Sequence, residues 1–191
     1  MFDTIYPRIC NWNAERYEQE FDKALSIQLI TEEFEEWLKA LSEKNEVEQV
    51  DALCDLIYVA FGIIWKKNPI EAEVDYNAKQ ANIIISTLMT VDELPGLFIA
   101  TSLLAYGLNE EYSDILFAQF VIQAAATEMF GMGFEAEDIT EAMTIVCDSN
   151  DSKVATKTAS NVKANIDKGE NFIAPEPRLR LLLEKVNARH N

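Results

Sequence analysis

The chain has 191 residues, of which 49% are hydrophobic and 26% charged, a balance typical of a compact folded domain. Asp and Glu number 33 against 16 Lys and Arg, and the formal net charge of −17 argues against non-specific binding to nucleic acid or to anionic membranes. The sequence shows no apolar run long enough for a membrane span and no secretion signal at its start, so we expect a cytoplasmic protein whose three cysteines are reduced.

Apolar residues recur with the helical period along most of the chain, which contains five Pro and six Gly. This pattern predicts an all-α protein with helices at residues 13–43, 46–66, 70–90, 93–106, 110–131 and 136–149. Residues 150–174 are polar, and residues 179–186 form a short amphipathic stretch. We expect a single domain over residues 1–191, a helical bundle in which residues 150–191 are an extended tail that wraps the bundle or a partner subunit.

Residues 68–128 have two interpretations. They are either an inserted helical segment or a degenerate repeat of the earlier helices, because residues 76–131 faintly resemble residues 21–66. The segment from Glu110 to Phe117 looks like a second copy of the acidic segment from Glu48 to Asp55. The predicted helix before it has no matching glutamate cluster, and both interpretations stay open.

The first predicted helix carries four glutamates within five residues. At about 100° of rotation per residue, Glu32, Glu33 and Glu36 fall inside the arc of the apolar side chains, whereas Glu35 points away. A carboxylate on an apolar face costs free energy unless a cation balances its charge. The spacing therefore predicts that three of the four glutamates face the core and that a cation lies near them.

The second predicted helix is apolar almost all round, and its acidic strip consists of Glu48, Asp51 and Asp55. Asp51 and Asp55 are one helical turn apart and repel each other unless one is protonated or a cation bridges them. A short turn at residues 42–45 makes the two helices antiparallel neighbours, so the two acidic strips can converge. Several carboxylates around one cleft suit Mg²⁺ or Mn²⁺, which can hold a polyphosphate and activate water. An acidic surface facing solvent is the alternative interpretation.

Four ordered motifs carry a family resemblance. The segment Glu33 to Glu36, preceded by Glu32, matches an E-x-x-E motif, and Asp51 to Asp55 follows at the expected spacing. Val146 to Lys153 looks like V-x-x-S-N-x-S-K, and Lys168 to Pro175 looks like K-G-x-N-F-x-x-P. Together these segments resemble the MazG-like group of the all-α nucleoside triphosphate pyrophosphohydrolases, especially its phage-type members.

The resemblance implies an all-α bundle that hydrolyses the bond between the α- and β-phosphates of a nucleoside triphosphate, giving the monophosphate and pyrophosphate. It implies two or three Mg²⁺ or Mn²⁺ ions bound by Glu33, Glu36 and Asp55, with Asp51 as a further ligand. Glu32 would be a ligand or the base that orients the water. These residues form the expected catalytic and metal-binding set.

The resemblance also implies a substrate-binding set. Asn150 and Lys153 would contact phosphate or sugar, and Lys168 is a weaker candidate for the same role. Trp12 and Asn13 precede the predicted first helix, where an indole could stack on a base and an amide could read its edge. Phage-type relatives make guanine the first choice of base, and the family implies a homo-oligomer, a dimer or tetramer, located in the host cytoplasm if the chain is phage-encoded.

Two departures from the family pattern leave alternatives open. The usual glutamate three residues before the final aspartate is Ala52 here, so Asp51 or Glu48 must substitute. The link to the C-terminal motifs is also longer than usual, so Glu111 and Asp114 could form the second acidic motif instead. The alternative functions are an enzyme like phosphoribosyl-ATP pyrophosphohydrolase and a non-catalytic helical protein that binds metal or a protein partner.

Overall fold

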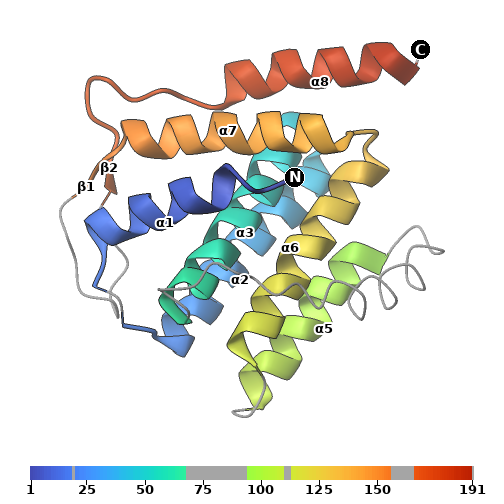
Figure 1. Ribbon diagram of the computed structural model, residues 1–191. Helices are drawn as coiled ribbons and strands as arrows, with labels where there is room; N and C mark the ends of the chain where they lie inside the picture. The colour runs from blue at the N-terminus through green and yellow to red at the C-terminus, as the bar shows by residue number, and fades with distance from the viewer. Residues whose placement is uncertain (19, 68–93, 110–112, 156–165, 191) are drawn as a thin grey trace.

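The computed structural model describes residues 1–18, 20–67, 94–109, 113–155 and 166–190, and in these ranges the protein is helical, as predicted (Figure 1). The helices are α1 (Ile5–Arg16), α2 (Lys23–Glu43), α3 (Glu46–Lys67), α5 (Leu94–Leu108), α6 (Asp114–Gly131), α7 (Ala136–Ser152) and α8 (Glu176–His190). Two strands of two residues each, β1 (Val154–Ala155) and β2 (Ile166–Asp167), pair antiparallel after α7.

The predicted helix over residues 13–43 is wrong in its first part, because the chain leaves the helical conformation between α1 and α2. Tyr17 is extended, with φ −124° and ψ 153°, and α2 begins after Asp22, whose carboxylate accepts a hydrogen bond from the Leu25 N–H at 2.8 Å. A side chain that caps a helix in this way marks a new start. Trp12 and Asn13 therefore lie within α1 and not before the first helix.

The α2–α3 hairpin turns where the sequence predicts. Lys44 adopts a left-handed conformation, with φ 55° and ψ 35°, and its N–H reaches the carbonyls of Ala40 and Leu41. The following Asn45 accepts a hydrogen bond from the N–H of Glu48 at 3.4 Å. The turn makes α2 and α3 antiparallel neighbours, which places their acidic strips side by side.

The third helix, α3, runs through the middle of the bundle and packs against α1, α2, α6, α7 and α8 (Figure 1). Its fully buried side chains include Val50, Leu53, Leu56 and Ile57. Burying one such side chain contributes about 1.5–3 kcal/mol. Because α3 is enclosed on most sides, a polar residue on it is costly unless it faces a cavity or a charged partner.

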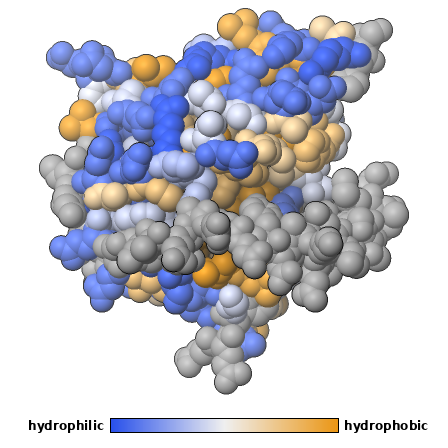
Figure 2. Space-filling view, in the orientation of Figure 1, coloured by the Kyte–Doolittle hydropathy of each residue, from blue (hydrophilic) through white to orange (hydrophobic). Residues whose placement is uncertain are grey.

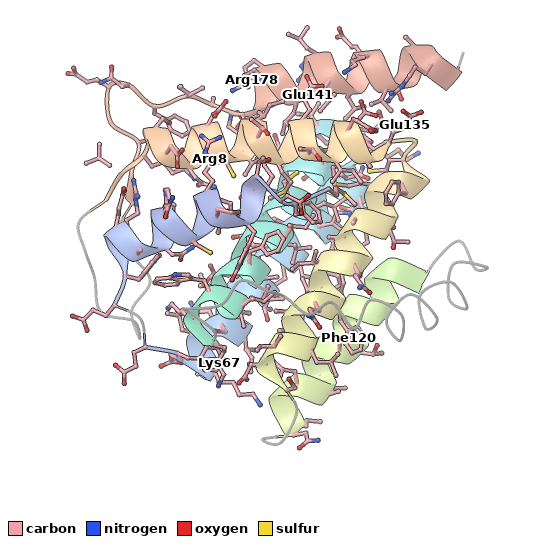
Figure 3. All side chains as sticks on the ribbon, viewed as in Figure 1. Arg8, Lys67, Phe120, Glu135, Glu141 and Arg178 are labelled. Carbon is pink, nitrogen blue, oxygen red and sulfur yellow. The ribbon has the colours of Figure 1, made fainter. Side chains whose placement is uncertain are left out.

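The predicted amphipathic stretch at residues 179–186 is part of a longer helix, α8, which lies along α7 (Figure 1). Its buried residues are Leu179, Leu182, Leu183 and Val186. Arg8 of α1 and Arg178 of α8 reach α7 from opposite sides (Figure 3), and both donate hydrogen bonds to Asp148. The tail thus covers its own bundle. The predicted helix at residues 70–90 lies outside the described residues.

Hydrophilic residues cover most of the face formed by α1, α7 and α8, with smaller apolar areas between them (Figure 2). Within the described ranges, no single helix is long and apolar enough to cross a membrane. By length and composition, α6 and α7 pass that test as a pair, but the pair is bent by 116°.

Candidate active site

A cavity of about 670 Å³ lies between α1, α2 and α3, and the end of α7 and the segment after β2 complete its wall. Eight of the ten predicted site residues line it; the exceptions are Glu32 and Asp51. The full lining is Trp12, Asn13 and Tyr17, then Leu25, Ser26, Leu29, Glu33 and Glu36, then Asp55, Tyr58, Val59, Gly62, Ile63 and Lys66, and finally Asn150, Lys153 and Lys168. Segments far apart in the sequence therefore meet at one cavity.

The α2–α3 hairpin gives the cavity two different ends. On α3 the lining residues recur every three or four positions from Asp55 to Lys66, and on α2 they recur in the opposite direction from Glu36 to Leu25. In each stripe the first and last residues are eleven positions apart, about 16 Å along the helix axis. The carboxylates of Glu36 and Asp55 lie at the end near the hairpin turn, and Lys66 lies at the far end.

Burial and mutual repulsion act on the acids of α3. Burial raises the pKa of Asp55, the neighbouring Glu33 and Glu36 raise it further, and Lys153 offsets part of the rise. Burial also raises the pKa of Asp51, followed by the charges of Asp55, Glu176 and Glu48. The two aspartates therefore carry their negative charges at a cost in free energy.

Asp51 and Glu32 differ in where they sit relative to the cavity. The Oδ1 atom of Asp51 is buried and has no hydrogen-bond partner among the described residues. Glu32 accepts a hydrogen bond from Gln28 Nε2 at 2.9 Å, on the exposed side of α2. Asp51 is thus an unbalanced acid next to the cavity, whereas Glu32 is engaged outside it.

The prediction that three glutamates of α2 face the core is wrong for one of them. Glu32 and Glu33 are partly buried, but Glu36 is exposed and lines the cavity at its mouth. The reason is that α2 lies at the edge of the bundle, packing on α3 and α5, so only a narrow arc of it is enclosed. Leu38 and Leu41, 43% and 45% exposed, lie outside that arc.

The end of α7 supplies a lysine held by neighbouring groups. Asn150 is buried, and its Oδ1 accepts a hydrogen bond from Lys153 Nζ at 2.7 Å. The main-chain carbonyl of Asn150 accepts a hydrogen bond from Trp12 Nε1 at 3.0 Å. Because Lys153 also acts on the charges of Asp51 and Asp55, its ammonium lies near both the amide and the acids. Lys168 lines the cavity with Nζ 4.8 Å from the centre of the Phe172 ring.

The side of the cavity formed by α1 carries an aromatic ring and an amide. Trp12 is buried, with its ring edge-on to Tyr58 at 5.6 Å between centroids, and the guanidinium of Arg16 lies 4.5 Å from the Trp12 ring. The Nδ2 atom of Asn13 donates to the Ile9 carbonyl at 2.8 Å. Trp12 and Asn13 are thus fixed parts of the wall, held by α1 itself and by α7.

The alternative second motif, Glu111 and Asp114, is not at this cavity as far as the structure describes it. Glu111 lies outside the described residues, and Asp114 begins α6, where its carboxylate contacts Lys67 Nζ and the Tyr106 hydroxyl, both at 2.6 Å. Burial raises the pKa of Asp114, but these hydrogen bonds outweigh burial and lower it. Asp114 therefore behaves as a paired carboxylate that joins α3, α5 and α6.

The donor set at the acidic end fits a divalent cation. Hard carboxylate oxygens line the wall, and a buried Asp51 oxygen has no partner among the described residues. Burial and then repulsion raise the pKa of both α3 aspartates. In the described ranges, no three Asp, Glu, His or Cys side chains converge closely enough to enclose an ion. The cavity acids therefore provide oxygen ligands of the kind that a divalent cation prefers, but their side chains would have to move closer together to bind one.

Sequence reasoning missed several wall residues, of which Lys66 is the most informative. Lys66 follows Asp55 by eleven positions, which returns it to nearly the same side of α3. Ser26 precedes Glu33 by seven positions and shares its side of α2 in the same way. Extending the two acidic faces along their helices would have found both residues.

Residues 3–73 match the family model of phosphoribosyl-ATP pyrophosphohydrolase. The matched range contains α1, α2 and α3 with both acidic motifs, and it confirms the resemblance to the all-α pyrophosphohydrolases. It supports a pyrophosphohydrolase-type activity, that is, a hydrolase acting on an acid anhydride. Comparison with curated proteins and with solved structures gave no match.

Proposed function

We propose that this relative of the all-α pyrophosphohydrolases is a metal-dependent nucleoside triphosphate pyrophosphatase. It would hydrolyse the α–β phosphate bond of a ribo- or deoxyribonucleoside triphosphate to the monophosphate and pyrophosphate. The observation that carries the proposal is one cavity in which Glu33, Glu36 and Asp55 meet Lys153, a residue of a separate motif about a hundred positions away.

The acids of α2 and α3 would hold the cation. We assign Glu33, Glu36 and Asp55 as ligands and Asp51 as a further one; bound Mg²⁺ or Mn²⁺, two or three ions, would neutralise phosphate charge and make water more acidic. Glu32 does not line the cavity and is bonded to Gln28, so we assign proton removal from the attacking water to Glu33 or Asp55 instead.

Lys153 and Asn150 would act on the phosphates. The water oxygen forms a bond to the α-phosphorus. The bond from the α-phosphorus to the oxygen that bridges the α- and β-phosphates breaks, so negative charge moves to the leaving pyrophosphate. The Lys153 ammonium, which donates to the Asn150 amide oxygen, would also donate to phosphate oxygens. Trp12 fixes Asn150 through its main-chain carbonyl, which makes Trp12 a positioning residue in this proposal. Lys168 adds a second positive charge to the wall.

The proposal is tested by incubating the chain with each nucleoside triphosphate plus Mg²⁺ or Mn²⁺ and measuring pyrophosphate and monophosphate. We expect both products, and no pyrophosphate from any nucleotide would reject the proposal. Glu36→Gln should lower kcat/KM about 100-fold or more, because it removes a charged ligand from the cavity. Glu35→Gln is the matched control, since Glu35 is exposed on the same helix and does not line the cavity.

The family match favours a second candidate, a phosphoribosyl-ATP pyrophosphohydrolase-like enzyme. The same cavity acids would serve both substrates, so kcat/KM for phosphoribosyl-ATP beside the nucleoside triphosphates decides between them. A non-catalytic metal-binding protein is the remaining alternative; it predicts that metal raises the melting temperature whereas nucleotides have no effect and yield no product.

We also propose that the chain forms a homo-oligomer, a dimer or tetramer, in the cytoplasm, where such an activity would adjust the nucleotide pool. The half-exposed Leu38 and Leu41 on α2 are apolar side chains that a second copy would cover. Light scattering during size-exclusion chromatography measures the mass, and a monomer at micromolar concentration would contradict this part of the proposal. Residues 68–128 stay a predicted insertion or degenerate repeat within a single domain.

A further inference from the structure

Lys66, which belongs to none of the sequence motifs, lines the cavity at the end opposite to the carboxylates. Asp55 and Lys66 share one stripe of α3 and are separated by about 16 Å along its axis. If the acids and Lys153 take the phosphates of a nucleotide, the remainder of the molecule extends along this stripe. The base then lies toward Lys66.

The surroundings of Lys66 keep its ammonium at the wall. The side chain is partly buried, and Nζ lies 5.0 Å from the centre of the Tyr17 ring, another wall residue. Helical side chains lean toward the N-terminus of their helix, which for Lys66 is the direction of Gly62, one turn earlier. Since Gly62 has no side chain, the Asn13 amide lies against its backbone and forms the wall there.

Asn13 places a hydrogen-bond acceptor on the same stretch of wall. Its Nδ2 donates to the Ile9 carbonyl at 2.8 Å, an assignment that leaves Oδ1 as the acceptor of the amide. A β-carbon at Gly62 would lie 3.6 Å from this Oδ1, so the amide adjoins α3 one turn from Lys66. The far end of the cavity thus combines a donor-only ammonium with a carbonyl acceptor.

We propose that Lys66 and Asn13 select nucleotides whose base presents a carbonyl oxygen next to a ring N–H, which are those of guanine, hypoxanthine, uracil and thymine. Lys66 donates to the carbonyl oxygen, and Asn13 Oδ1 accepts from the ring N–H. This inference rests on the proposed function, because the proposed phosphate site sets the orientation of the nucleotide.

Adenine and cytosine carry the opposite pattern. Each has an amino group, a donor, next to a ring nitrogen that accepts. The amino group would face the Lys66 ammonium, and the ring nitrogen would face Asn13 Oδ1, so neither hydrogen bond forms and both pairs repel. A hydrogen bond to a charged donor gives a discrimination of about 10- to 100-fold.

The first test measures kcat and KM of the full chain for dGTP, dUTP, dATP and dCTP with Mg²⁺. Wild type should prefer dGTP and dUTP, and Lys66→Met should remove at least about 10-fold of that preference, mainly through KM. Lys66→Arg should retain it, because the guanidinium is also a donor. Lys67→Met is the matched control: Lys67 is the next residue, pairs with Asp114 and does not line the cavity.

The second test measures binding of dGMP and dAMP by calorimetry with Mg²⁺, which requires no turnover because neither monophosphate contains the bond that is hydrolysed. Tighter binding of dGMP that Lys66→Met abolishes supports the inference even if no nucleotide is hydrolysed, in which case only the proposed function fails. Pyrophosphate release with equal or better use of dATP and dCTP overturns the inference and leaves the proposed function standing. An equal loss for all four nucleotides in Lys66→Met also overturns it, since Lys66 would then act on the phosphates or on the fold.

Discussion

The carboxylates of α7 and those of α3 differ in how their charges are balanced. On α7, Asp148 accepts hydrogen bonds from Arg8 and Arg178, and Asp138 accepts them from Arg189 and the Glu135 N–H. Burial raises the pKa of both α7 aspartates, but these hydrogen bonds outweigh burial and lower it.

On α3 the pKa values of the two aspartates shift in the opposite direction, upward. Burial raises the pKa of Asp51 and Asp55, neighbouring acids raise it further, and Lys153 offsets only part of the rise. The sequence contains 16 Lys and Arg, and several of them are bound to acids that join helices. The α7 acids are therefore balanced by cations that join helices, whereas among the described residues Lys153 balances only part of the charge of the α3 acids.

The largest effect is expected for Asp55→Asn on α3. We expect kcat/KM to fall about 100- to 1000-fold, because the proposed metal ligand loses its charge, while the melting temperature stays unchanged or rises. Pyrophosphate release and thermal unfolding in EDTA give the two readings. If the variant unfolds more easily yet keeps its activity, Asp55 has the same structural role as the acids of α7, and the prediction is wrong.

The converse variant is Asp138→Ala on α7. It removes the partner of Arg189 and one half of the capping box with Glu135, so the free energy of unfolding should drop by about 2 kcal/mol. Urea unfolding measures the drop, and Glu137→Ala, an exposed neighbour in the same first turn, is the control. Since Asp138 does not line the cavity, kcat/KM at a temperature where the variant is folded should remain near the wild-type value.

The smallest effect is expected for Asp51→Asn, and its sign depends on pH. The folded state raises the pKa of Asp51, so the folded chain binds this proton more tightly than the unfolded chain. The stability due to Asp51 is therefore fully present below its unfolded pKa, about 3.9, and is lost as the pH rises toward the raised value. In EDTA at pH 8 the variant should be more stable than wild type by about 1–2 kcal/mol.

Two controls follow from the same reasoning for Asp51→Asn. The stability gain should nearly vanish near pH 3.5, where the wild-type carboxyl is largely protonated in both states. Adding Mg²⁺ should stabilise wild type more than the variant, because the variant has lost a ligand. A variant less stable than wild type at pH 8 in EDTA would show that the Asp51 carboxylate is balanced within the chain after all.

Much of the fold follows from local patterns. The helical period predicts α3, α6 and α7 to within a few residues, because each is long and repeats apolar side chains at helical spacing. The break between α1 and α2 was missed because the apolar periodicity continues across it. The signal for the break is the single residue Asp22, whose side chain caps the start of α2. The length of α8 also escaped prediction, since its packing on α7 depends on tertiary partners such as Asp148.

The candidate site divides in the same way. Residues with a charge inside a motif, such as Glu33 and Lys153, were predicted and lie at the cavity. Lys66 was missed because it has no motif, and a lysine at the end of a helix is usually solvated. The exposure of Glu36 was also missed, because the width of the buried arc of α2 depends on which helices pack beside it.

The hydrogen bond from the Trp12 indole to the Asn150 carbonyl spans 138 positions of the chain. During synthesis, helices α1, α2 and α3 emerge first and bring the acids of the cavity together, but the wall that holds Lys153 arrives only after α7. Closing so long a loop is slow relative to forming the helices themselves. A nascent chain would therefore expose acids without the lysine beside them, and the complete cavity would be among the last parts of the protein to form.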